Sequence, residues 1–300
     1  SEEFLSIFSI AAVLFFIWVI YCSTLSAGAV SMDLSTYASG NFLSGTTKSA
    51  AFAFKFILTS FFLTLPLAPF SQWFNKSIEK LPELVTIPVI IFLTAFIFYC
   101  LRLSDLLFFS FLEKYQFLFL GIGITSAIFS ISELFSKTQR RAMLACMPKF
   151  FFSLILVALG FASKDSLRAA YLLCFIVPVF SGLILYVSSL ETYGLTQRIL
   201  LALFGAYLLG IPGTPMFYVF AYLGTRAMEI SVLQIILFGL LWFLYFYANV
   251  HICRRIFIDD EKIYVDPMLE AHEHTSGRAL FAIFLLLFVG LMAWLLRDFL

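Results

Sequence analysis

Charged side chains are scarce in this chain. Lys, Arg, Asp and Glu make up 12% of its 300 residues, about half of the roughly 25% that is usual in a soluble domain. The net charge is only +1, which argues against a nucleic-acid partner or an acidic partner. Because 62% of the residues are hydrophobic, the scarcity of charge predicts an integral membrane protein.

Residues that could hold a metal ion or form a disulfide framework are also few. The five cysteines stand singly in or beside apolar runs, without a C-x-x-C spacing, which disfavours both kinds of site. His272 and His274 flank Glu273, but a third ligand is not evident. The sequence contains no phosphate-binding loop, dinucleotide fingerprint or Ser/His/Asp set. We therefore expect no catalytic residue, metal or cofactor in this chain.

Long apolar runs fill most of the sequence. A helix needs about 20 apolar residues to cross a bilayer, whereas a membrane-crossing strand alternates in polarity over about 9–11 residues. The runs do not alternate, so we expect an all-α membrane protein with about nine transmembrane helices. They cover roughly residues 4–22, 49–68, 83–101, 115–135, 142–162, 168–188, 199–222, 229–252 and 279–296.

Lys and Arg are distributed unevenly between alternate loops. About ten lie in loops on the side of the N-terminus and about seven on the other side. This excess predicts that the N-terminus faces the mitochondrial matrix or the cytoplasm. With an odd number of helices, the C-terminus is then on the opposite side.

Proline and glycine interrupt the second and seventh expected helices. A helix break is tolerated in a bilayer only where protein or a water-filled cavity satisfies the freed backbone groups. A break therefore indicates an ion or substrate path. For the first break, a helix that simply ends at proline is the alternative. The interrupting residues are Pro66, Pro69, Gly210, Pro212 and Pro215.

Both breaks lie in motifs. The first leads into Pro69-Phe70-Ser71-Gln72-Trp73, and the second reads Gly210-Ile211-Pro212-Gly213-Thr214-Pro215-Met216-Phe217. They resemble the motifs at the broken seventh and twelfth helices of the antiporter-like membrane subunits of respiratory NADH:ubiquinone oxidoreductase (complex I). Within that family the resemblance is to subunit 2, called subunit N in bacteria. Ser71 stands where the family has histidine.

Other segments resemble the same subunit in the same order: residues 24–34, 136–145 and 189–195. The resemblance covers the family's helices six to fourteen, so the first five are missing. The resemblance implies that another polypeptide supplies them or that the subunit is truncated. Because the family consists of two inverted five-helix repeats, the resemblance implies a remnant of the first repeat, a complete second repeat, and a charged loop with a terminal helix, at residues 1–103, 104–256 and 257–300.

The resemblance implies a membrane-arm subunit of the mitochondrial, proton-translocating NADH:ubiquinone oxidoreductase. Its location would be the mitochondrial inner membrane, with the bacterial plasma membrane as the alternative. Such a subunit is non-catalytic, and the FMN and iron–sulfur clusters of the parent complex would lie in other chains. The expected partners are other membrane-arm subunits, membrane lipids, and any chain that supplies the missing helices.

The lysines through which the family moves protons are not found here. Thr64 and Thr94 stand at two of these positions, and Phe220 stands near a third. Lys55 and Lys149 are other lysines near the spans, and for both the favoured interpretation is snorkelling to the membrane interface. We therefore expect a structural contribution rather than a complete proton path. The candidate residues of any surviving path are Lys55, Thr64, Thr94 and Lys149.

Two other functions remain open. A stand-alone secondary transporter, or a cation/proton antiporter subunit of related fold, needs a coupled ionisable pair near the membrane midplane. The sequence shows no such pair clearly. An apolar assembly protein without a transport role is the third hypothesis, and the series of motifs argues against it.

Overall fold

The computed structural model describes residues 83–137, 140–188, 212–230 and 232–257, with shorter parts at 58–67 and 73–74 and a few single positions. The described residues form helices and turns and no strand, which confirms the all-helical fold class. Several expectations lie outside the described residues: the last span at 279–296, most of the first span, Pro69, and the segment containing His272 and His274.

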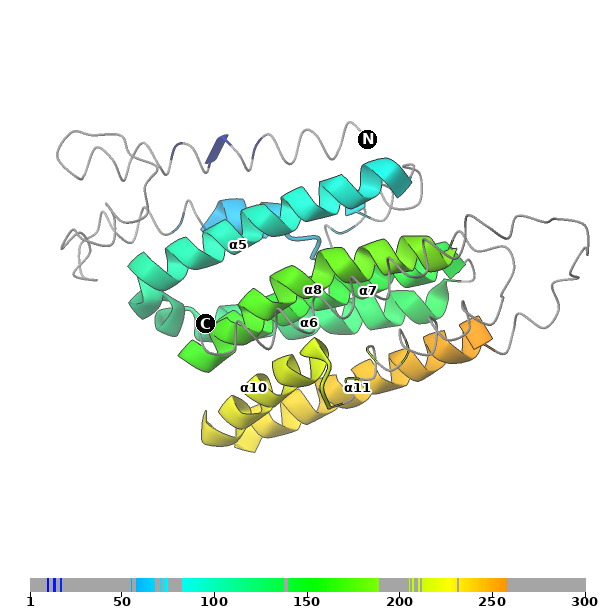
Figure 1. Ribbon diagram of the computed structural model, residues 1–300. Helices are drawn as coiled ribbons and strands as arrows, with labels where there is room; N and C mark the ends of the chain where they lie inside the picture. The colour runs from blue at the N-terminus through cyan, green and yellow to red at the C-terminus, as the bar shows by residue number, and fades with distance from the viewer. Residues whose placement is uncertain are drawn as a thin grey trace, which may run out of the picture.

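Six long helices run roughly side by side (Figure 1). In this view α7 and α8 lie near the middle, with α5 along one side and α10 and α11 along the other. The most extensive contacts join α6 to α7 and α7 to α8. The helices are α5 (Glu83–Lys114), α6 (Gln116–Ser136), α7 (Arg140–Gly160), α8 (Lys164–Ser188), α10 (Pro215–Ile230) and α11 (Val232–Phe257).

Three of the described helical segments are long and apolar enough to cross a membrane. They are Gln116–Ser136, Lys164–Gly182 and Gln234–Ile252. Two shorter apolar segments, Pro88–Arg102 and Ala145–Gly160, lie beside them. These helices support a helical membrane protein, and the expected number of nine spans stays a prediction.

Two segments that we expected to be loops are helical, so these two predictions are wrong. Helix α5 does not end near residue 101 but continues to Lys114, since no proline or glycine follows Pro88 until Gly121. The expected loop at 223–228 lies inside α10, and only Ser231 separates α10 from α11. Gly224, Arg226 and Glu229 therefore do not end the helix.

Helical conformation ends at both expected breaks. Residues 58–64 are helical and Leu65–Leu67 are not, so the first helix ends just before Pro66, which has no N–H to donate. A helix that simply ends at proline fits this segment as well as a broken helix does. In the seventh expected span, turns occupy Gly210 and 212–213, and Gly210 adopts a φ of 66° that favours glycine.

Pro215 lies at the end of the second interruption. It is the first residue of α10, a position where the missing N–H is harmless and proline is favoured. Thr214 precedes it, and the Phe217 N–H donates to the Thr214 carbonyl at 3.1 Å. The break therefore ends one helical segment and starts a new one, and α10 begins partway along α11 (Figure 1).

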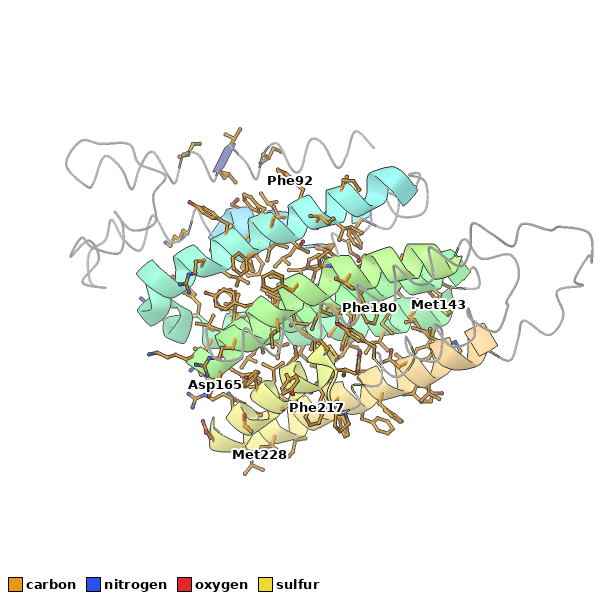
Figure 2. The ribbon with its side chains drawn as sticks, viewed as in Figure 1. Phe92, Met143, Asp165, Phe180, Phe217 and Met228 are labelled. Carbon is orange, nitrogen blue, oxygen red and sulfur yellow. The ribbon has the colours of Figure 1, made fainter. Side chains whose placement is uncertain are left out.

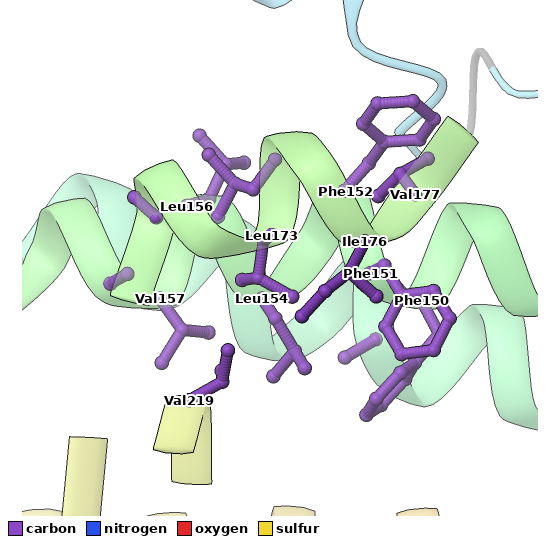
Figure 3. Packing of buried hydrophobic residues seen from close by; sticks show 14 of the residues in the cluster. Phe150, Phe151, Phe152, Leu154, Leu156, Val157, Leu173, Ile176, Val177 and Val219 are labelled. Atoms are coloured by element: carbon purple, nitrogen blue, oxygen red, sulfur yellow. The ribbon is translucent and has the colours of Figure 1, made fainter. Parts of the chain in front are cut away.

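The centre of the bundle is α7, whose residues 145–160 are all buried. A helix that is hydrophobic around its whole circumference is expected to be surrounded by protein. The side chains of Phe150, Leu154 and Val157 pack among those of neighbouring helices (Figure 3). Figure 2 shows side chains filling the space between the helices, with Met143 and Asp165 at opposite ends of the bundle.

Candidate functional site

An ion pair with a buried ammonium and a partly exposed carboxylate joins α7 to α6. The Lys149 ammonium donates a hydrogen bond to Oε2 of Glu133. The side chain of Lys149 is 1% exposed and that of Glu133 is 28% exposed. The other carboxylate oxygen, Oε1, lies 3.8 Å from Nζ of Lys137, which is 33% exposed. One carboxylate thus lies between a buried ammonium and an ammonium at the end of α6.

Helix geometry explains why these side chains meet. Lys149 is nine residues after Arg140, the start of α7, which corresponds to about 13 Å along the helix axis. Long side chains on a helix lean toward its N-terminus. Glu133 lies three residues before the end of α6, and α6 ends at the same end of the bundle at which α7 begins. Lys149 therefore reaches from the middle of α7 toward Glu133.

The interpretation that Lys149 snorkels to the membrane interface is wrong in this structure. Its side chain is enclosed by protein, and its charge is matched inside the bundle by Glu133. Sequence reasoning also missed Glu133. A signal was available, because Glu133 is the one charged residue within α6 and Lys149 lies in the next span, beyond a short turn.

The polar side chains around this pair form one half of the α6–α7 seam. On α7, residues 149, 153, 157 and 160 share one face by their spacing, and both the first and the last of them contact α6. Ser153 is buried, and its hydroxyl donates to the Lys149 carbonyl at 2.9 Å. We call Ser126, Ser130, Glu133, Lys149 and Ser153 the polar half of the seam.

In the other half of the seam, glycines allow α6 and α7 to lie in close contact. A Cβ added at Gly160 would lie 2.5 Å from Cγ of Leu120, and one added at Gly123 would lie 2.9 Å from Cγ2 of Val157. The backbones of α6 and α7 approach closely here, as at small-residue contacts between membrane helices generally. We call Leu120, Gly123, Val157 and Gly160 the packed half of the seam.

An aromatic cluster lies between the ion pair and the helix break at Gly210. The Phe150 and Tyr245 rings are stacked with centroids 4.9 Å apart, and Phe220 lies 5.0 Å from Tyr245. Phe220 also reaches within 3.7 Å of the position that a Cβ on Gly210 would occupy. The cluster consists of Phe150, Phe151, Phe180, Tyr207, Phe220 and Tyr245.

The other expected site residues are not part of this arrangement. Thr64 and Thr94 are buried, and their hydroxyls donate to carbonyls of their own helices, Thr64 to Phe61 at 2.8 Å and Thr94 to Ile91 at 2.9 Å. Lys55 is exposed. Within the described part of the chain, no hydrogen bond or ion pair joins any of these three residues to Lys149.

Neither a protein-family model nor a curated protein sequence matches this chain. The site must therefore be interpreted from its own chemistry. A charge inside a membrane protein is costly, and such residues usually line ion paths or proton relays. Removing one member of a buried ion pair costs about 3–5 kcal/mol, whereas replacing both with apolar groups is often neutral. Stability alone therefore does not explain the pair, and proton exchange between an amine and a carboxylate is chemistry that it can perform.

Proposed function

We propose that this chain is an antiporter-like subunit of the membrane arm of a mitochondrial NADH:ubiquinone oxidoreductase. The helix break at Gly210 and 212–214 carries the proposal. The motif around this break resembles the family's twelfth helix, and a half-length helix starts directly after it. Continuous helices suffice for a purely structural membrane bundle, whereas broken helices recur in transporters.

In this role the chain is a non-catalytic subunit. Its redox partners, FMN and iron–sulfur clusters, belong to other chains of the complex, and ubiquinone reduction occurs elsewhere. The chain would lie in the mitochondrial inner membrane against other membrane-arm subunits and lipid.

The lysine path of the family is not proposed for this chain. Buried threonines at 64 and 94 can hydrogen-bond but cannot carry a charge, and Phe220 can do neither. Both threonine hydroxyls are buried and donate to carbonyls of their own helices, as hydroxyls in a protein core usually do. The subunit is therefore proposed to contribute mainly structure along the family's path.

Affinity purification in a mild detergent tests this proposal. An epitope tag on the chain should recover a large membrane complex that oxidises NADH and reduces a quinone. A tagged membrane protein of similar size from another complex is the control. Recovery of the chain without NADH-oxidising activity, under conditions that keep the parent complex intact, would contradict the proposal.

A stand-alone cation/proton antiporter is the second candidate, and the Lys149–Glu133 pair favours it. That function needs a coupled ionisable pair inside the bundle, and this pair joins two helices by a buried ammonium. The two candidates differ in one measurement. An antiporter should exchange cations for protons in liposomes that contain this chain alone, whereas a membrane-arm subunit should translocate protons only with NADH oxidation.

A further inference from the structure

We propose that Lys149 and Glu133 form a proton-exchanging pair that is open to the membrane face where α6 ends and closed to the opposite face. The inference deepens the proposed function, because it gives the subunit a site that takes up and releases a proton at one face without completing a path across the membrane. It depends on the geometry of the α6–α7 seam, and one of its tests does not depend on the parent complex.

The opening is defined by the graded exposure of three charged side chains. Exposure rises from 1% at Lys149 to 28% at Glu133 and 33% at Lys137. Lys137 is the C-cap of α6, where the polypeptide leaves the apolar span. The uneven distribution of Lys and Arg predicts that this face is the matrix or cytoplasmic side.

Closure has two physical causes. Toward the opposite face, the packed half of the seam leaves too little space for a methyl group at Gly160, 2.5 Å from Leu120, and hence for a water molecule. Toward the Gly210 break, Lys149 is followed directly by Phe150 and Phe151, which contact Tyr245 and Phe180. The rings of Phe150, Phe151 and Phe180 cannot accept or carry a proton along a hydrogen-bonded chain.

The exchange itself is a balanced proton transfer. The Lys149 ammonium gives a proton to the Glu133 carboxylate, which yields a neutral amine and a carboxylic acid without a change in total charge. The acid then releases this proton to water at the open face, leaving an amine beside a carboxylate. Uptake of one proton from the same face restores the ion pair.

Other ionisable groups face this region and must be separated from the pair. On α11, His251 and Tyr247 contact Phe135 of α6 at ring-centroid distances of 4.9 Å and 5.4 Å. Tyr245 of α11 contacts Phe150, which directly follows Lys149 in α7. None of these groups is a carboxylic acid, so a signal specific to carboxyl groups isolates Glu133 from them.

The first test uses infrared spectroscopy of the full chain in lipid nanodiscs, with pH varied across the physiological range. We expect a carboxyl C=O band that appears on acidification, is lost in Glu133→Gln and is shifted in Lys149→Met. In vesicles with one orientation of the chain, a pH jump at the face where α6 ends should change this band at once. A band that does not titrate, or that responds first to the opposite face, would overturn the proposal.

The second test uses the assembled complex and two variants. Lys149→Arg keeps the positive charge, but a guanidinium does not release its proton. The double variant Lys149→Met/Glu133→Gln removes both charges, so that neither is left unpaired. Both should assemble, oxidise NADH and keep the wild-type number of protons moved per NADH, because the pair releases and takes up its proton at the same face. If both variants move fewer protons per NADH than the wild type while the controls do not, the pair is open to both faces and the proposal is overturned.

Two controls match these variants. Arg226 and Glu229 form an exposed ion pair at 2.8 Å near the end of α10, so the double variant Arg226→Gln/Glu229→Gln removes the same charges away from the seam. Lys55→Met removes an exposed lysine. Both should keep the proton ratio. If the chain does not purify with an NADH-oxidising complex, the proposed function fails, while the infrared titration still decides the proton-exchanging pair.

Discussion

The two halves of the α6–α7 seam are formed by the same two helices and yet differ in kind. In the polar half, side chains of opposite charge meet, and buried hydroxyls donate to carbonyls of their own helix. In the packed half, glycines bring the two backbones together without any polar side chain. A single helix pair can thus combine a chargeable site with a tight seal, separated by about two helical turns.

The comparison teaches where a membrane bundle tolerates a charge. Between membrane helices there is little hydrophobic driving force, so association depends on close packing and on polar contacts. The packed half supplies the close packing, and the polar half supplies the polar contacts. Each half should therefore respond to a different kind of substitution, which the following predictions use, from the largest expected effect to the smallest.

The largest effect is expected when Glu133 loses its charge. Glu133→Gln leaves the ammonium groups of both Lys149 and Lys137 without this carboxylate, and should lower the free energy of unfolding by about 3 kcal/mol. Lys149→Met should lower the free energy of unfolding by less, because Glu133 still lies near the Lys137 ammonium. Unfolding of the two variants in detergent micelles, followed by circular dichroism, measures both free energies.

The double variant Lys149→Met/Glu133→Gln is the control for this prediction. It leaves no uncompensated charge in the seam, so it should recover most of the stability lost in Glu133→Gln. A double variant as unstable as Glu133→Gln would mean that lost packing, rather than an unpaired charge, explains the effect.

Methyl groups in the packed half should have the next largest effect. Gly160→Ala and Gly123→Ala force α6 and α7 apart, because Leu120 and Val157 lie within 2.9 Å of the added Cβ atoms. The expected loss of stability is about 1–3 kcal/mol, measured by the same unfolding experiment. Gly121→Ala is the matched control on α6, since nothing lies within 4 Å of its Cβ position, and it should be neutral or stabilising by up to about 1 kcal/mol.

A smaller effect is expected from the buried hydroxyl of Ser153. Ser153→Ala removes a hydrogen bond to the Lys149 carbonyl and should cost about 1 kcal/mol. Ser132→Ala removes a similar bond to the Ile128 carbonyl on the exposed face of α6 and should cost less. Equal losses of stability in the two variants would show that a hydrogen bond in the seam contributes no more to stability than one on the exposed face of α6.

The smallest effect is expected at the end of the seam. Lys137 and Glu133 form a partly exposed i,i+4 pair at 3.8 Å, and such pairs contribute about 0–1 kcal/mol. Lys137→Gln should therefore change stability by less than about 1 kcal/mol, with a smaller change in high salt. A loss as large as that of Glu133→Gln would show that the polar half extends further toward the helix end than we infer.

Much of the local structure followed from the sequence. Apolar runs predicted the helices α6, α7 and α8 to within a few residues, and proline and glycine predicted that helical conformation ends near Pro66 and Gly210. Both depend on interactions within a few residues along the chain, through backbone hydrogen bonds and dihedral preferences. The extension of α5 to Lys114 was missed because a change in polarity does not end a helix when nothing breaks its hydrogen bonds.

The sequence alone determined that the chain is helical, apolar and interrupted at two places, because these properties are local. Only the tertiary structure decided that Lys149 is buried rather than snorkelling, since its environment depends on which residue of α6 faces it. Only the tertiary structure decided the role of Glu133 as well, because its position near the end of α6 does not show that the Lys149 ammonium of α7 lies beside it. Gly123 and Gly160 likewise act as a seal only because the facing helix places Val157 and Leu120 against them.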